Sequence, residues 1–218
     1  MRKGLIGTRR IATGAATVAA LAMMVGCKAG PPDGAGRGKA RYAICAPCHG
    51  DNGAGRKDVE APAIAGMSKW YLTAQLNKFR NGIRGAHKDD VEGLRMRPMS
   101  KTLFKDVDVD AVADYVSKMT PQRPVATLTG GDAKRGAPLF AACTACHGPD
   151  GKGKVELKAP SLLLTHDWYL ARQIHKFKDG VRGTSALDVT GGQMRPMALT
   201  LTNKQAVLDV VAYIATLK

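Results

Sequence analysis

The chain has 218 residues and a formal net charge of +15 at pH 7; four of its positive charges lie among the first ten residues, so residues 27–218 carry +11. Only 5% of the residues are aromatic, and they form no extended pattern interleaved with basic residues of the kind used for stacking on nucleic-acid bases. We therefore exclude nucleic acid as a partner. The charge indicates either steering toward acidic proteins or anionic lipid, or a generally solvated basic surface.

Residues 1–26 are predicted to be an export signal outside the fold. A basic segment precedes an apolar stretch over residues 11–25, which is too short to span a membrane. Met24-Val25-Gly26-Cys27 is similar to a bacterial lipobox and predicts acylation of Cys27. The alternatives are a plain cleaved signal, an uncleaved anchor and a free thiol. Residues 27–35, rich in Gly and Pro, are predicted to be a flexible tether.

Residues 36–120 are predicted to form the first of two small domains. A short helix over residues 39–45 leads into Cys45-Ala46-Pro47-Cys48-His49, a C-x-x-C-H motif. Two thiols at this spacing can form thioethers with the two vinyl groups of one haem, and the histidine that follows can bind the iron. Zinc binding and a redox dithiol are the alternatives for a lone CxxC.

Apolar residues at helical spacing predict two further helices in this domain. The first covers residues 69–81 and is capped by Ser68; the second is the last helix of the domain, capped by Asp106 or Asp108. No alternating strand pattern is evident, so the domain is predicted to be all-α.

The second half repeats the first at an offset of 98 residues, without insertion or deletion. Residues 121–131, with two prolines and two glycines, are the predicted linker, and residues 132–218 the predicted second domain, whose last helix is capped by Thr202. Its motif contains Cys143, Cys146 and His147. Two such motifs, each followed by a glycine-rich loop, favour two covalently bound haem c groups over zinc or a dithiol.

The identity of the sixth iron ligand distinguishes an electron carrier from a haem enzyme. A thioether favours Fe(II) and closes the iron to substrate, although a lone methionine in a core is more often a gap-filler. Each half has Met-x-x-Met just before its last helix: Met96 with Met99, and Met194 with Met197. The rivals are histidines that the other half does not repeat: His87, His166 and His175, opposite Ser185, Ser68 and Asn77.

With CxxCH in tandem, a methionine before each last helix and a Trp-Tyr-Leu helix in each half, residues 36–217 resemble the dihaem cytochrome c4 family. The resemblance implies two class I cytochrome c domains related by pseudo-twofold symmetry, with haem propionates facing each other. It implies Met96 and Met194 as iron ligands, seven residues before Leu103 and Leu201. Its candidates to line or neutralise the propionates are Trp70, Trp168, Tyr71, Tyr169, Arg84 and Arg182. The lipobox departs from the family, many of whose members are soluble or peripherally attached periplasmic proteins.

We expect a periplasmic electron carrier rather than an enzyme, anchored to the membrane through acylated Cys27. Its donor would be a quinol:cytochrome c reductase or a periplasmic dehydrogenase, and its acceptor a terminal oxidase. One alternative is a dedicated cytochrome subunit of a dehydrogenase. Another is a dihaem enzyme, such as a peroxidase or a thiosulfate-oxidising dehydrogenase, which would need an open iron position with acid or base groups beside it.

Overall fold

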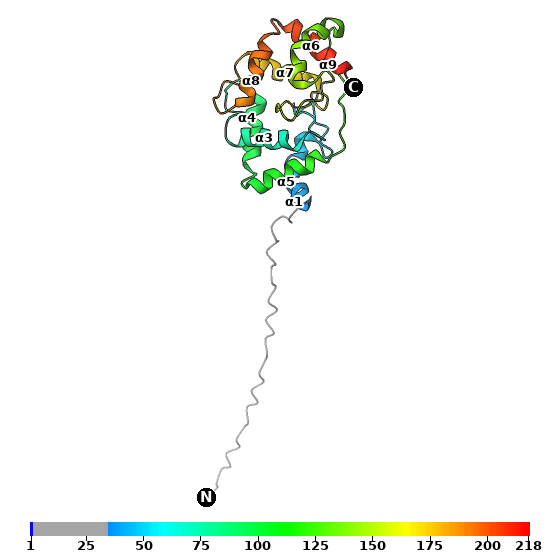
Figure 1. Cartoon of the computed structure of the whole chain (residues 1–218). Helices are drawn as coiled ribbons and strands as arrows, with labels where there is room; N and C mark the ends of the chain where they lie inside the picture. The colour runs from blue at the N-terminus through cyan, green and yellow to red at the C-terminus, as the bar shows by residue number, and fades with distance from the viewer. Residues whose placement is uncertain (2–34) are drawn as a thin grey trace. The chain divides into compact units, whose positions relative to one another are not determined.

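The computed structural model describes Met1 and residues 35–218. The export signal, the acylation site Cys27 and most of the tether lie outside the described residues. Within residues 35–218 every regular element is a helix, apart from two isolated antiparallel bridges, Arg56–Ala61 and Lys154–Ala159 (Figure 1). The predicted all-α fold class is confirmed.

The helices of the described region follow one order in both halves of the chain. In the first half, coloured blue to green in Figure 1, they are α1 (Ala35–Tyr42), α2 (Ala46–His49), α3 (Lys69–Arg80), α4 (Val91–Lys101) and α5 (Asp106–Ser117). In the second half they are α6 (Ala133–His147), α7 (Asp167–Lys178), α8 (Val189–Leu199) and α9 (Lys204–Thr216).

The two halves differ where the CxxCH motif begins. The first half breaks the helix after Tyr42 and starts α2 with Pro47 in its first turn, whereas α6 runs unbroken through the second motif. Proline has no N–H to donate to the carbonyl four residues earlier, so Pro47 disfavours a continuous helix. Ala145, which has an N–H, stands at the equivalent place inside α6. The prediction of one helix over residues 39–45 was therefore wrong in its bounds.

Helices α4 and α8 hold the Met-x-x-Met segments and were not predicted. Glycine and proline inside both segments lower their helix propensity, so neither segment is recognised as a helix from the sequence. The signal that could have found them is the N-cap: Asp90 accepts from the Gly93 N–H, and Asp188 does the same in the second half.

The caps predicted for the two last helices, α5 and α9, were also wrong. The N-cap of α5 is Lys105, so Asp106 and Asp108 lie inside its first turn. The N-cap of α9 is Asn203, whose side chain accepts from the Ala206 N–H, rather than Thr202. Ser68 does precede α3, but its side chain makes no capping bond.

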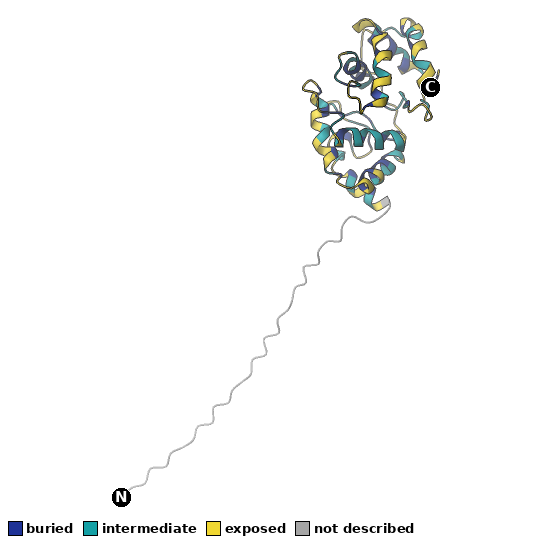
Figure 2. Cartoon of the chain, turned by 60° about the vertical axis from the view of Figure 1, so that its left-hand side comes forward, coloured by how far each residue is buried: buried dark blue, intermediate teal, exposed yellow. Residues whose placement is uncertain are grey.

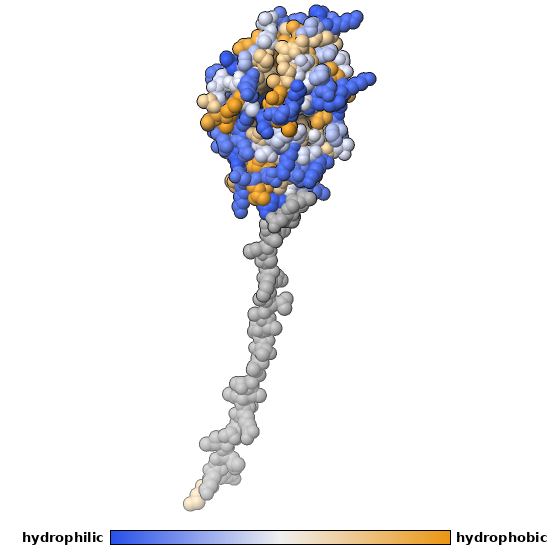
Figure 3. Space-filling model, in the orientation of Figure 1, coloured by the Kyte–Doolittle hydropathy of each residue, from blue (hydrophilic) through white to orange (hydrophobic). Residues whose placement is uncertain are grey.

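Each half has its own apolar core, lying on the inward faces of its helices (Figure 2). The first is centred on Leu72, Leu103 and Val112, and the second on Phe140 and Val210. The face seen in Figure 3 is mostly hydrophilic, with small separate hydrophobic patches. Among the described residues, no helix combines the length and apolar character needed to cross a bilayer.

Candidate functional site

Both motif histidines are buried and held by a backbone carbonyl. The Nδ1–H of His49 donates to the Pro62 carbonyl at 2.9 Å, and that of His147 donates to the Pro160 carbonyl at the same distance. Burial lowers the pKa of each imidazole, and the bond to the carbonyl only partly opposes this. A neutral imidazole with Nδ1 engaged leaves Nε2 as the atom that can bind iron.

No disulfide joins the four motif cysteines. Burial and the neighbouring Cys48 raise the pKa of Cys45 to about 11, and burial likewise raises the pKa of Cys143. The thiols of Cys45 and Cys143 are therefore protonated at neutral pH before they form thioethers, unlike the thiols of redox dithiol sites, whose pKa is lowered. No group of three or more metal-binding His, Cys, Asp or Glu side chains occurs within the described part of the chain.

Each CxxCH motif opens into a large apolar cavity. The first encloses about 1390 Å³ of space not filled by atoms, including open solvent at its mouth, and the second about 1860 Å³ on the same measure. Cys45, Cys48 and His49 line the first; the second is lined by the equivalent residues Cys143, Cys146 and His147. Thiols, imidazole and apolar walls thus meet in one space in each half.

Both methionines of each pair line the cavity of their own half. They differ in burial: Met96 and Met194 are half-buried and pack against the cores, whereas Met99 is 40% exposed and Met197 38%. None of the rival histidines His87, His166 and His175 lines either cavity.

Two buried arginines lie where the cavities meet. Arg84 donates to Gln75 at 2.7 Å, and Arg182 donates to Gln173 at 2.6 Å. Burial and the like charge of Arg84 lower the pKa of Arg182 to about 10. Two guanidinium groups buried this close to each other favour an anionic group beside them.

Buried N–H donors without a hydrogen-bond partner also favour an anionic group at this place. Within residues 35–218, three pairs of residues related by the 98-residue offset leave an indole or guanidinium N–H without a hydrogen bond: Trp70 and Trp168, Arg84 and Arg182, Arg97 and Arg195. Buried N–H groups of native proteins are almost always paired. A group that is apolar in its body and carries carboxylates fits both the apolar cavities and these donors, as haem does.

Reciprocal ion pairs join the two halves beside these arginines. Lys78 of α3 contacts Asp188, which caps α8, at 2.5 Å; Lys176 of α7 contacts Asp90, which caps α4, at 2.5 Å. No sequence pattern predicts this pairing, although both the lysine and the aspartate are repeated at the same offset.

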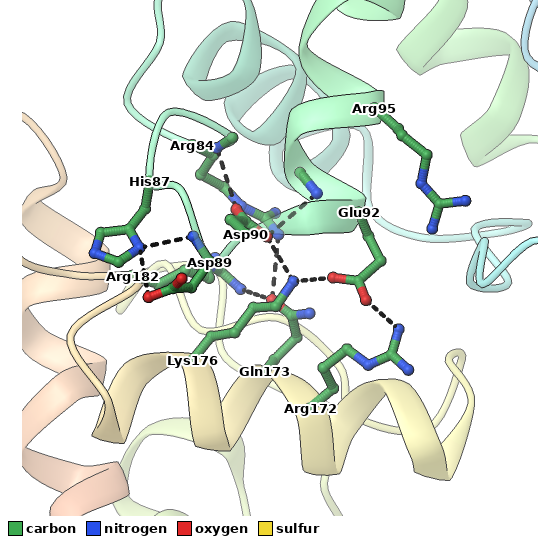
Figure 4. A network of polar contacts seen from close by, with 12 residues as sticks. Arg84, His87, Asp89, Asp90, Glu92, Arg95, Arg172, Gln173, Lys176 and Arg182 are labelled. Atoms are coloured by element: carbon green, nitrogen blue, oxygen red, sulfur yellow. Dashed lines mark hydrogen bonds and ion pairs between the residues drawn. The ribbon is translucent and has the colours of Figure 1, made fainter.

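The ion-pair cluster around Lys176, which Figure 4 shows, contains more carboxylates than the equivalent cluster around Lys78. There α7 points Lys176 and Arg172 toward the start of α4, where both contact Glu92. Arg172 also reaches Glu60 at 2.7 Å. At the equivalent place Lys78 meets the Thr190 hydroxyl at 2.6 Å instead of a second carboxylate.

Comparison with known proteins agrees with this geometry. The cytochrome c family model matches residues 35–120 and again residues 133–218. Cytochrome c4 of Azotobacter vinelandii is 31% identical over 179 residues, covering 78% of this chain and 82% of that protein. The chain belongs to the dihaem cytochrome c4 family. Its two CxxCH motifs, one in each cytochrome c domain, mean that it carries two haem c groups.

Two further relatives extend the comparison. The crystal structure of reduced recombinant cytochrome c4 from Pseudomonas stutzeri superposes with a TM-score of 0.69 at 29% identity, covering 84% of this chain and 98% of that one. A protein named thiosulfate dehydrogenase electron acceptor, from Thiomonas intermedia, is 34% identical over 75% of this chain and 74% of its own length. The chain is an electron-transfer protein, and its family implies a periplasmic location.

Proposed function

We propose that this cytochrome c4 relative carries electrons between a membrane quinol-oxidising complex or a periplasmic dehydrogenase and a terminal oxidase. In this proposal His49 and Met96 hold one iron, and His147 and Met194 hold the other. Bound haem supplies the one-electron chemistry of iron. The motif cysteines would hold it covalently, and the histidine and methionine of each half would bind its iron and keep water from it.

One observation carries the ligand assignment: in each half a histidine and a half-buried methionine line the same apolar cavity from different helices. His49 lies on α2 and Met96 on α4, and the second half repeats this arrangement. A thioether ligand in an apolar site stabilises Fe(II) and leaves no open position for a reactant. The greater exposure of Met99 and Met197 favours their partners in each pair.

The wall between the cavities supports an electron step inside the molecule. Tyr71, Gln75, Tyr169 and Gln173 line both cavities, so a single layer of side chains separates them. Bound carboxylates reaching the buried Arg84 and Arg182 would draw the two redox groups toward this wall.

The ligand set has a direct spectroscopic test. The ferric protein should show the weak long-wavelength band of methionine-ligated haem and should bind cyanide slowly. Rapid cyanide binding together with peroxide turnover would refute the closed iron and favour a peroxidase.

A second candidate function is a dedicated electron acceptor for a dehydrogenase. It is favoured by the relative from Thiomonas intermedia, whose name specifies such a role. Stopped-flow reduction by a purified thiosulfate dehydrogenase and by a quinol:cytochrome c reductase would separate the two. The physiological donor should reduce the protein faster by orders of magnitude and with a steep dependence on salt.

We also propose that Cys27 is acylated and anchors the protein to the membrane. The support is the sequence Met24-Val25-Gly26-Cys27 after an apolar stretch. Mass spectrometry of the mature protein should find Cys27 as a lipidated N-terminus, and C27S should release the protein from membranes. A mature N-terminus elsewhere would refute the anchor.

A further inference from the structure

A histidine of the second half contacts the loop that holds the first haem's histidine. The Nδ1 atom of His166, the residue just before α7, accepts the N–H of Ala63 at 3.0 Å. The carbonyl on the other side of that same peptide group belongs to Pro62, and it accepts the Nδ1–H of His49 at 2.9 Å. One peptide group therefore joins His49 of the first half to His166 of the second.

We propose that His166 is a positioning residue that tunes the first haem through the Pro62–Ala63 peptide. Hydrogen bonds in series polarise one another, so an N–H that donates to His166 makes the Pro62 carbonyl a stronger acceptor. A stronger bond from the His49 Nδ1–H makes the imidazole a better electron donor to iron. The His166 contact thus favours Fe(III) and lowers the reduction potential of the first haem.

The contact depends on the protonation state of His166. Only the neutral ring has an Nδ1 lone pair for the Ala63 N–H; the protonated ring is a donor at both nitrogens. Protonation therefore removes the bond and adds a positive charge near the first haem, and both effects raise its potential. We expect this potential to rise as the pH falls through the pKa of His166.

The charged groups around His166 place this transition at acidic pH. Burial and the nearby Lys57 lower the pKa of His166, and the adjacent Asp167 opposes them. The Asp167 carboxylate is shared with the linker, since it accepts from the Thr127 and Leu128 N–H groups. The Trp168 ring lies 5.2 Å from the imidazole and carries the Arg172 guanidinium, itself paired with Glu60, over its face.

The second haem provides an internal control. The residue equivalent to His166 is Ser68, which cannot titrate in this range, and the residue equivalent to Ala63 is Ser161. The His147 bond to the Pro160 carbonyl matches that of His49 in length. The two sites thus share the proximal bond and differ in the histidine behind it.

The experiment measures both midpoint potentials of the haem-loaded protein from pH 8 to pH 5, by spectroelectrochemistry. Three variants are compared with the wild type. H166S introduces the residue that stands at this place in the first half, and H166N keeps a side-chain acceptor that does not titrate. H175N is a control at a histidine within α7. The amide shift of Ala63, followed by NMR, reports independently whether its N–H is hydrogen-bonded.

In the wild type, one potential should rise at acidic pH more than the other. H166S should raise that same potential at neutral pH and remove the difference in pH dependence. H166N should also remove it, while keeping the neutral-pH potential wherever the Ala63 shift shows the bond retained. H175N should behave as the wild type.

The proposal is overturned if H166S shifts neither potential or both equally, or if the differential pH dependence persists in H166N. It rests on His49 being the ligand of the first iron, and the ferric spectrum tests that separately. Loss of the histidine–methionine spectrum in the wild type would refute the ligand assignment, whereas an intact spectrum with unresponsive potentials would refute the role of His166 alone.

Discussion

Removing one lysine of the reciprocal ion pairs should destabilise the protein far more than removing a surface lysine. In K176M the Asp90 carboxylate, only 1% exposed, loses its cation, and Glu92 loses a partner as well. Removing one member of a buried pair costs about 3–5 kcal/mol because the remaining charge stays buried. Asp90 keeps the N–H groups of Gly85 and Gly93, each at 3.2 Å, so we expect the lower end, about 3 kcal/mol.

This loss corresponds to a fall in Tm of roughly 6–12 °C for a chain of this size. It can be measured by urea unfolding of the haem-loaded protein, followed by far-UV circular dichroism. K78M removes the equivalent lysine from Asp188 and should lose a similar amount. The matched control is K118M, which breaks an exposed i,i+4 pair with Asp114 and should change stability by less than about 0.5 kcal/mol.

A loss below about 1 kcal/mol in K176M would refute the reasoning, as would an equal loss in K118M. Either result would mean that water or a rearranged neighbour compensates Asp90, and that the two halves are held together by their apolar contacts.

Three further predictions follow from the sites. M96A should lower the potential of one haem and speed cyanide binding to it, whereas M99A should do neither; the opposite outcome would reverse the assignment, by redox titration and ligand-binding kinetics. G93A should destabilise the protein by about 1 kcal/mol or more in urea unfolding despite alanine's better helix propensity, because its Cβ would lie 2.1 Å from the Asp90 carboxylate. Burial raises the pKa of Asp90 and of Asp188, but the bond to the lysine outweighs it, so both pKa values lie below the usual range. A lowered folded-state pKa contributes stability that is complete above about pH 4 and is lost as the pH falls through the folded-state value, so acid should destabilise the wild type more than K176M.

Local patterns carried most of what the sequence could predict. CxxCH is short, and its chemistry needs no distant partner, so two copies were enough to predict two haem groups. The 98-residue repeat predicted two similar helical domains because each copy encodes its own core. Helices α4 and α8 were not predicted because they contain Gly93, Pro98 and their counterparts in the second half, and glycine and proline have low helix propensity.

The contacts between the two halves could not be predicted from the sequence. Lys176 and Asp90 are 86 residues apart, and His166 and Ala63 are 103 apart. No periodicity links residues at such distances, because the pairing depends on how two finished domains pack. The repeat marks Lys78, Lys176, Asp90 and Asp188 as equivalent residues but does not say that each pair crosses between the halves.

The sequence by itself determined the cofactor number and the helical class, and it predicted the proximal ligands, since bond-forming groups a few residues apart are positioned by local backbone geometry. Only the tertiary structure decided which methionine of each pair is half-buried in the cavity, where the buried arginines lie, and which second-half histidine contacts the peptide behind His49. Those features depend on burial and on contacts between distant segments, and both arise only when the chain has packed.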